Sequence, residues 1–209
     1  NKMMTEADCV LACGSRFSDR SVGTFEEFEK NLKIIHMDVD PAEIGKNQTT
    51  NIAVVGDVKT SLRIMVKMLI QKTIKRNGES AWTKRVKETK DFYRENLKIH
   101  PHPLAASKVL KKLREVLPEQ SIVTTEVGQH QMWASLFFDV IHPGTFFSST
   151  GLGTMGWGFP AAIGAKAARP DVPVLDIAGE GSFNMTENSL AVSVLDNLPV
   201  IVFLLNNFS

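Results

Sequence analysis

Short apolar runs that end in glycine or polar clusters are the feature that most constrains the fold of this chain. "VPVLDIAGEG" at 172–181 and "PVIVFLLNN" at 199–207 have few polar interruptions, so we expect both to be central strands of a sheet. Further runs with this pattern are "DCVLACGS" (8–15), "LKIIHMDVDP" (32–41), "IAVVGD" (52–57), "SIVTTEVG" (121–128) and "TFFSSTG" (145–151). Helical segments alternate with these runs, which predicts an α/β fold of parallel sheets flanked by helices.

Three helices are predicted from apolar spacing and composition. After Asp57, one helical face is formed by Val58, Leu62, Met65, Val66 and Leu69. Pro103 suits the first position of a second helix. "GFPAAIGAKAA" at 158–168 is a helix of small residues, suited to close packing.

The chain divides into two α/β blocks and a charged connector. We expect an incomplete domain at 1–72, a connector at 73–100 and a second incomplete domain at 101–209. Basic residues outnumber acidic ones in the connector, and Trp82, Val86 and Tyr93 recur at near-helical spacing. A solvated linker helix with one docked edge is favoured over a nucleic-acid patch. Both ends of the sequence read as cut from something longer.

Composition excludes several classes of protein. The net charge of +1 gives no global electrostatic case for binding nucleic acid or a membrane. No segment approaches the apolar length of a transmembrane helix. The only cysteines, Cys9 and Cys13, argue against a disulfide framework and for a reducing compartment, so we expect a cytoplasmic protein. Their spacing lacks a second ligand pair for zinc, and we expect buried thiols.

Polar or glycine-rich clusters follow several expected strands of the second block. "EVGQH", "STGLGTMG", "GEGS" and "NNFS" stand where strands end, and ligands bind at the carboxyl ends of parallel strands. Gly179 and Gly181 allow a close backbone approach, and the helix expected to follow, with Thr186 as N-cap and Glu187 in its first turn, offers free N–H groups to a phosphate. Glu180 and Asn207 supply hard oxygen ligands suited to Mg²⁺. The alternative is a simple glycine turn and a strand end.

The spacing of these clusters resembles that of a known cofactor site. Residues 182–205 separate Gly181 from Asn206, which resembles the thiamine diphosphate fingerprint, Gly-Asp-Gly followed at such an interval by Asn-Asn. The resemblance implies that Mg²⁺ is held by Glu180, Asn207 and the carbonyl of Ser209. Glu180 departs from the family's Asp: it is longer by one methylene, about 1.5 Å of bond, whereas Mg²⁺ tolerates little geometric error.

Other stretches narrow the family. "TTEVGQHQMWA", "GLGTMGWGFPAAIGAK" and "DIAGEGSFNMT" resemble the catalytic subunits of acetolactate synthase (acetohydroxyacid synthase). "GSRFSDRSVG", "IIHMDVDPAEIGKN" and "VVGDV" resemble the central FAD-binding domain of that family. The similarity runs over nearly the whole chain and is weakest at 73–100. It implies that 1–72 is the C-terminal half of the central domain, and that 101–209 is the N-terminal part of the thiamine diphosphate domain.

The resemblance also implies residue roles. Diphosphate contacts are expected from Gly128, Gln129, His130, Gly181 and Ser182. The aminopyrimidine ring is expected to lie against Gly153, Thr154 and Met155. FAD is expected to contact Gly14, Ser15, Arg16, Arg20, Asp38 and Asp57. The plainer alternatives are a structural histidine, a core methionine and a surface ion pair among Arg16, Asp19 and Arg20. The other histidines, His36, His100, His102 and His142, receive no role.

The implied activity is that of acetolactate synthase. Such an enzyme condenses two 2-ketoacids, pyruvate with pyruvate or 2-ketobutyrate, releasing CO₂ in branched-chain amino acid biosynthesis. The family's proton-shuttling glutamate lies in an N-terminal domain that this sequence lacks, and Glu126 is not that residue. We therefore assign no catalytic residue and expect no synthase activity from this chain alone. The intact enzyme is expected to be at least a homodimer, with a possible regulatory small subunit.

Three alternatives stay open at this point. Another thiamine diphosphate enzyme, such as pyruvate oxidase, glyoxylate carboligase or sulfoacetaldehyde acetyltransferase, would share the fingerprint. A non-catalytic nucleotide- or flavin-binding module would use only the central-domain motifs. A nicotinamide dehydrogenase is weaker: "GLGTMG" fits G-x-G-x-x-G literally, but the acid expected downstream would have to be Asp176, inside the next strand.

Overall fold

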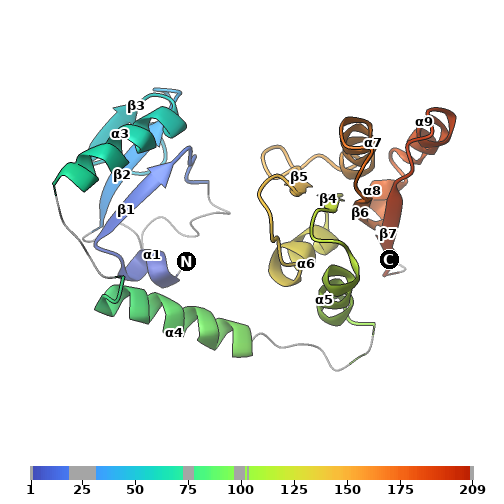
Figure 1. Cartoon of the computed structure of the whole chain (residues 1–209), viewed down its shortest axis with the longest axis horizontal. Coiled ribbons are helices and arrows are strands. Elements are labelled where there is room, and N and C mark those ends of the chain that lie inside the picture. Colours follow the sequence, from blue (N-terminus) through green and yellow to red (C-terminus); the bar gives the residue numbers. More distant parts are fainter. Residues whose placement is uncertain (1, 19–31, 73–77, 97–101, 103, 208–209) are drawn as a thin grey trace. The chain divides into compact units, whose positions relative to one another are not determined.

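The chain folds into two compact units (Figure 1). The computed structural model describes residues 2–18, 32–72, 78–96, 102 and 104–207. Unit 1 spans Asn1–Leu97 and unit 2 spans Lys98–Ser209. None of the described helices is long and apolar enough to cross a membrane.

Unit 1 is built on a three-stranded parallel sheet in the order β1-β2-β3. The strands are β1 (Cys9–Cys13), β2 (Lys33–Asp38) and β3 (Ile52–Val55), and the described helices are α1 (Lys2–Glu6), α3 (Val58–Gln71) and α4 (Ala81–Asn96). Its small core consists of Ala12, Phe17 and Ile34, with Met4, Val10 and Leu32 packed against it. The predicted strands and parallel pairing are confirmed.

The prediction that both cysteine thiols are buried is wrong. Cys9 and Cys13 are exposed and form no disulfide. Side chains alternate between the two faces of a strand, so Cys9, Leu11 and Cys13 share one face of β1. Ala12, on the opposite face, is buried in the core. β1 is also the edge strand of its sheet, and its outward face remains open among the described residues.

Helix α3 confirms the helix predicted after Asp57. Asp57 is its N-cap, and its carboxylate accepts a hydrogen bond of 2.8 Å from the backbone N–H of Thr60. Hydrogen bonds with the side chain and with the backbone of Thr60 lower the pKa of Asp57. No residue of α3 is buried, and Val66 and Leu69 of the predicted apolar face are each more than half exposed.

Helix α4 lies within the stretch predicted as a charged connector. It belongs to unit 1, where the guanidinium of Arg85 donates hydrogen bonds of 2.9 and 2.8 Å to the two carboxylate oxygens of Glu6. Thr89 is buried, whereas Trp82 is exposed. The helix and its docked edge agree with the predicted solvated helix; the domain boundaries at 72 and 100 stay predictions.

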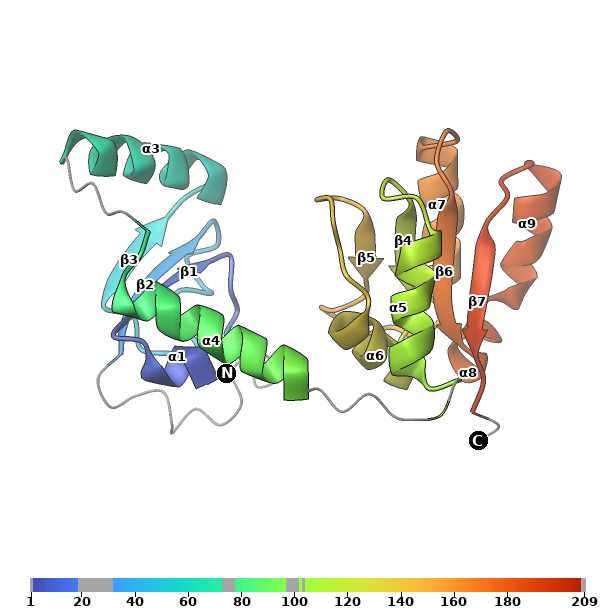
Figure 2. The same cartoon turned by 60° about the horizontal axis from the view of Figure 1, so that its bottom comes forward.

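Unit 2 contains a four-stranded parallel sheet in the order β5-β4-β6-β7 (Figure 2). Its strands are β4 (Ile122–Thr125), β5 (Phe146–Ser148), β6 (Val174–Gly179) and β7 (Ile201–Leu205). Its helical elements are α5 (Ala106–Val116), α6 (Gln129–Phe137), α7 (Gly158–Ala168), α8 (Glu180–Phe183), the 3₁₀ turn η2 (Glu187–Ser189) and α9 (Leu190–Leu195).

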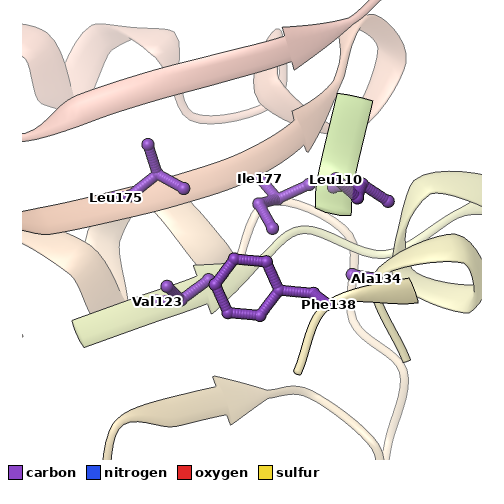
Figure 3. Close-up of a cluster of buried hydrophobic side chains, with 6 residues drawn as sticks. All are labelled: Leu110, Val123, Ala134, Phe138, Leu175 and Ile177. Carbon is purple, nitrogen blue, oxygen red and sulfur yellow. The ribbon is translucent and has the colours of Figure 1, made fainter. Parts of the chain in front are cut away.

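Helices cover both faces of this sheet. On one face, α5 and α6 pack on β4 and β6 through Leu110, Val123, Ala134, Phe138, Leu175 and Ile177 (Figure 3). On the other face, Ile122 and Val174 pack with Ala162 of α7 and with Val172. Neighbouring residues of β4 and β6 thus face opposite layers. This double burial explains why these strands read as nearly continuous apolar runs.

The two strands predicted to be central differ in position. β6 lies between β4 and β7, and all its residues are buried, which confirms the prediction. For β7 the prediction is wrong: among the described strands its only neighbour is β6. Phe203 and Leu205 pack against the core, whereas Ile201 and Leu204 are exposed. An apolar run indicates that a strand can be buried, but it does not specify how many neighbouring strands it pairs with.

Two predicted helix starts also need correction. Helix α5 begins at Ala106 with Ala105 as N-cap, so Pro103, which lies outside the described residues, is not its first residue. Thr186 does precede η2, with Glu187 in the first turn, but its side chain makes no capping hydrogen bond. Its hydroxyl oxygen is buried without a partner among the described residues.

Candidate functional site

The polar clusters of unit 2 meet at one edge of the sheet. Because the strands are parallel and in register, the carboxyl ends of β4, β5, β6 and β7 lie at the same edge. Chain order reverses there: β5 lies on one side of β4, and β6 on the other. Such a switch point is where open parallel sheets bind ligands.

A cavity of about 150 Å³ lies at this switch point. The segment after β4 contributes Val127, Gly128, Gln129 and His130, and α6 adds Trp133. Gly179, Glu180, Gly181 and Ser182 line it from the β6–α8 turn, Met155 from the loop before α7, and Leu205 and Asn207 from the end of β7. The fold therefore brings together eight of the predicted cofactor and metal residues.

His130 is one of two buried polar side chains among the described residues that line this cavity, the other being Ser182. His130 is 5% exposed, and its Nε2 has no hydrogen-bond partner among the described residues. Burial lowers the pKa of His130, while a hydrogen bond with the Glu126 backbone and the charges of Glu126 and Glu180 oppose that shift. Burial therefore favours the neutral ring, which has a single N–H. Nε2 can donate to a phosphate oxygen when that N–H is on Nε2 or when both ring nitrogens are protonated.

Two glycines make room for the His130 ring. A Cβ at Gly179 would lie 2.6 Å from its Nδ1, and a Cβ at Gly128 would lie 2.9 Å from its Cε1. Gly128 also adopts a φ of 154° as the N-cap of α6. Glycine is thus required sterically at both positions, in addition to any contact with a ligand.

Behind the cavity, Glu126 connects three segments. It is completely buried, and its carboxylate accepts hydrogen bonds of 2.9 Å from the backbone N–H groups of Gly156 and Phe159. The hydroxyl of Ser182 donates a third, of 2.6 Å, to the same carboxylate. The neighbouring strand carries Asp176, which is also buried and whose Oδ1 accepts a 2.8 Å hydrogen bond from Thr124.

The predicted aminopyrimidine segment lies in the loop between β5 and α7. Met155 lines the cavity and is 40% exposed, which argues against the alternative of a core methionine. Gly153, with a φ of 66°, and Thr154 are not among the lining residues. The backbone N–H of Thr154 donates a 3.2 Å hydrogen bond to Ser149 Oγ, which holds the loop on itself.

The predicted metal ligands are brought together only in part. Glu180 and Asn207 line the same cavity from neighbouring strand ends, whereas Ser209 lies outside the described residues. Within the described part of the chain, no group of three or more His, Cys, Asp and Glu side chains is placed to hold a metal ion. Among the predicted metal ligands, only Glu180 is an acidic side chain. The other ligands would be the Asn207 amide, the Ser209 carbonyl and oxygens of the bound cofactor.

A larger groove of about 720 Å³ adjoins this cavity. It runs between α5, α6 and β7 and shares Trp133, Leu205 and Asn207 with the cavity. Both asparagines of the "NN" pair line the groove, and only Asn207 also lines the cavity.

The predicted flavin residues of unit 1 lie at strand ends. Gly14, with a φ of 62°, follows β1, and its N–H donates to the carbonyl of Met37 at 2.8 Å. Asp38 ends β2 and is 8% exposed, and its Oδ1 accepts from Asp40 N. Asp57 caps α3. Ser15 and Arg16 follow Gly14, with Arg16 exposed; Arg20 and Asp19 lie outside the described residues.

Sequence reasoning missed Glu126, Trp133 and Asp176. The sequence excludes Glu126 as the family's proton-shuttling glutamate, because it precedes the diphosphate segment, and gives it no other role. Trp133 lies one helical turn after Gln129 on α6, so helical spacing from "GQH" would have placed it beside the cavity. Asp176 interrupts an apolar strand, and such an interruption is the one local signal of a buried polar residue.

Comparison with known proteins agrees with this arrangement. The model of the thiamine pyrophosphate enzyme C-terminal binding domain matches residues 126–209, and that of the central domain matches residues 1–65. Thiamine pyrophosphate and thiamine diphosphate are the same cofactor.

Curated relatives align over nearly the whole chain. A Methanocaldococcus jannaschii protein named "Probable acetolactate synthase large subunit" is 42% identical over 99% of this chain and 36% of its own length. "Acetolactate synthase 1, chloroplastic" of Oryza sativa is 41% identical over 99% of the chain and 32% of its own length. The chain thus spans about a third of the length of these relatives. It belongs to the thiamine pyrophosphate enzyme family, in the group that contains the acetolactate synthase large subunits.

Proposed function

We propose that unit 2 carries the diphosphate-binding part of a thiamine diphosphate site. The observation that carries this proposal is the cavity at the switch point, where the His130 Nε2 is buried without a partner among the described residues. Gly128, Gln129, His130, Gly181 and Ser182 would hold the diphosphate. Gly153, Thr154 and Met155 would lie against the aminopyrimidine ring.

Mg²⁺ would accompany the diphosphate. Glu180 and Asn207 line the cavity together, and the carbonyl of Ser209 would complete the protein's share of the ligands. Carboxylate, amide and carbonyl oxygens are the ligand types that Mg²⁺ accepts. Glu180 reaches further than the aspartate of the family fingerprint, so we expect the metal to bind more weakly than in a site with aspartate.

Unit 1 would hold FAD at the carboxyl edge of its sheet. The positions carried over from the family are Gly14, Ser15, Arg16, Arg20, Asp38 and Asp57. The open backbone at Gly14 and the nearly buried carboxylate of Asp38 support a nucleotide site at this edge. The corresponding domain assignment is 1–72 as part of the central domain and 101–209 as part of the cofactor domain, with 73–100 between them.

The whole protein would act as an acetolactate synthase. Thiamine diphosphate, when bound, would supply a nucleophilic carbon for addition to a 2-ketoacid. This chain's residues would bind the diphosphate, position the aminopyrimidine ring and narrow the access of water around His130. The substrates would be pyruvate and 2-ketobutyrate, in branched-chain amino acid biosynthesis. We expect this chain alone to show no synthase activity.

The assembly and the cellular location of the intact enzyme are further parts of this proposal. We propose that the intact enzyme is a homo-oligomer, at least a dimer, that associates with a regulatory small subunit. A cytoplasmic location suits the two exposed free thiols, which a reducing compartment keeps reduced. The Oryza relative is named as chloroplastic, so membership of this group does not by itself fix the compartment.

Isothermal titration of thiamine diphosphate into the chain, with and without Mg²⁺, tests the cofactor site. We expect Mg²⁺-dependent binding that tightens in Glu180→Asp, because the shorter side chain matches the family ligand. Glu187→Asp is the matched control, since Glu187 is an exposed acid in the adjoining turn and should leave the affinity unchanged. A folded chain that binds no thiamine diphosphate under either condition would contradict the proposal.

A further inference from the structure

The carboxylate of Glu126 is saturated with hydrogen bonds from segments far apart in sequence. Its Oε2 accepts from the N–H of Gly156 and from the hydroxyl of Ser182, and its Oε1 accepts from the N–H of Phe159. Glu126 itself follows the last residue of β4. One side chain therefore joins the end of β4, the start of α7 and the turn of α8.

A buried carboxylate is tolerated here because it serves as a distant cap for α7. Phe159 is in the first turn of α7, and the N-cap residue, Trp157, makes no side-chain capping hydrogen bond. The first turn also contains no acidic residue. The carboxylate of Glu126 satisfies an N–H that the helix leaves unpaired and faces the positive end of the helix dipole.

The two segments held by Glu126 are both walls of the cavity. Gly156 directly follows Met155, and Met155 and Ser182 both line the cavity. The hydroxyl of Ser182 also accepts from the N–H groups of Gly156, at 3.1 Å, and Val127, at 3.3 Å. The positions of the Met155 loop and the Glu180–Ser182 turn are therefore coupled through one carboxylate and one hydroxyl.

We propose that Glu126 is a positioning residue that sets the spacing between the Met155 loop and the Glu180–Ser182 turn. This inference rests on the proposed function, in which those two segments hold the two ends of thiamine diphosphate. Glu126 touches neither the cofactor nor the metal; it acts through Gly156 and Ser182. Its removal should harm a ligand that spans both segments more than a ligand that occupies only the diphosphate end.

Glu126→Gln tests this spacing with minimal change in shape. The amide keeps one acceptor oxygen, but its NH₂ group faces the donor N–H of Gly156 or of Phe159, so one of the hydrogen bonds to residue 126 is lost. We expect the affinity for thiamine diphosphate, measured with Mg²⁺ by isothermal titration, to fall by about tenfold or more. The affinity for inorganic pyrophosphate should fall much less, so the ratio of the two affinities drops.

Asp176→Asn is the matched control. Asp176 is a second buried carboxylate on the neighbouring strand, but it bonds Thr124 and does not line the cavity. We expect its affinity ratio to equal that of the wild-type chain. Hydrogen exchange at the amides of Gly156 and Phe159 should quicken in Glu126→Gln and not in Asp176→Asn.

Each outcome decides the inference. Should Glu126→Gln fail to fold, Glu126→Asp replaces it: the charge remains, but the shorter carboxylate cannot reach all three donors, and the ratio should again fall. A ratio that stays at the wild-type value, or a parallel loss of both affinities, overturns the inference while the cofactor site stands. A wild-type chain that binds no thiamine diphosphate overturns the proposed function and this inference together.

Discussion

At the scale of single residues, two buried carboxylates of unit 2 differ in how many hydrogen bonds they accept. Glu126 accepts three hydrogen bonds, whereas Asp176 accepts one, from Thr124, and its Oδ2 is buried without a partner among the described residues. Burial raises the pKa of Asp176 to about 7; the Thr124 hydrogen bond opposes this shift, and the charge of Glu126 adds to it. Both side chains are fully buried, so Glu126 and Asp176 differ in the number of hydrogen bonds that they accept and not in their burial.

The raised pKa of Asp176 predicts a stability that falls as pH rises. Between about pH 4 and pH 7 the unfolded chain loses this proton and the folded chain keeps it, so the free energy of unfolding decreases with pH. The full loss is up to about 4 kcal/mol. Asp176→Asn should remove this fall and be more stable than wild type at pH 8, as measured by urea denaturation from pH 4 to 8.

Asp171→Asn provides the comparison for that experiment. Asp171 is an exposed acid of unit 2 whose pKa is lowered to about 2, chiefly by its hydrogen bonds with Arg169. Its replacement should leave the slope between pH 4 and pH 7 unchanged. Equal slopes in wild type and Asp176→Asn would show that Asp176 does not carry the effect.

The packing of His130 gives a second prediction at this scale. In Gly179→Ala, the new methyl group would lie 2.6 Å from His130 Nδ1, so the ring must move out of its position beside the cavity. We expect a loss of about 1–3 kcal/mol in stability and weaker thiamine diphosphate binding. Thermal unfolding and the NMR signals of the imidazole ring measure both consequences.

Gly181→Ala separates this steric effect from a general intolerance of the turn. Apart from its chain neighbours and the backbone of its own helix, no atom lies within 4 Å of a Cβ built at Gly181, so the ring of His130 should keep its signals and the chain its stability. Unaltered His130 signals in Gly179→Ala would contradict the packing argument.

At the scale of elements, the two glycines of α7 have different surroundings. A Cβ at Gly158 would lie 2.5 Å from Asp176 Oδ1 and 2.6 Å from backbone atoms of β4 and its end, at Thr125 and Glu126. At Gly164, no atom outside the helix's own neighbouring backbone lies within 4 Å. Of these two glycines, only Gly158 is needed for close contact with the sheet; Ala162, which lies between them, packs on the sheet through its methyl group.

These two glycines form a matched pair for mutation. Gly164→Ala should stabilise the chain by about 0.5–1 kcal/mol, because alanine loses less backbone freedom in a helix. Gly158→Ala should destabilise it by more than that gain, since the obstacle is backbone that cannot rotate away. Urea denaturation of both variants measures the difference; changes of the same sign would contradict it.

At the scale of the whole molecule, each unit has its own sheet and its own buried cluster. Independent cores predict two unfolding transitions in calorimetry. Thiamine diphosphate with Mg²⁺ should raise only the transition of unit 2, by about 2.7 kcal/mol of stability at a hundredfold excess over Kd. Asp176→Asn identifies that transition, because Asp176 belongs to unit 2.

Two other results of the calorimetry would contradict this expectation. A shift of both transitions by the cofactor would show that the unfolding of the two units is coupled. A shift confined to the other transition would place the cofactor in unit 1 and contradict the proposed site.

The sequence by itself determined the strands, the α/β class, most helices and the segments that form the cavity. These features depend on local patterns: apolar runs between glycine and polar clusters for strands, and helical spacing for 58–71. The motifs after β4 and β6 could be located because parallel strands deliver their carboxyl ends to one edge. The structure shows which of the predicted residues line the cavity. The roles of these residues, such as binding a metal, stay predictions.

Only the tertiary structure decided which faces and edges are covered. Cys9 is exposed, and β7 has one described neighbour. Burial depends on what packs against a strand, and the sequence of the strand itself does not specify this. The same holds for Glu126. Its partners Gly156, Phe159 and Ser182 come from segments distant in sequence, and only folding brings their donors to one carboxylate.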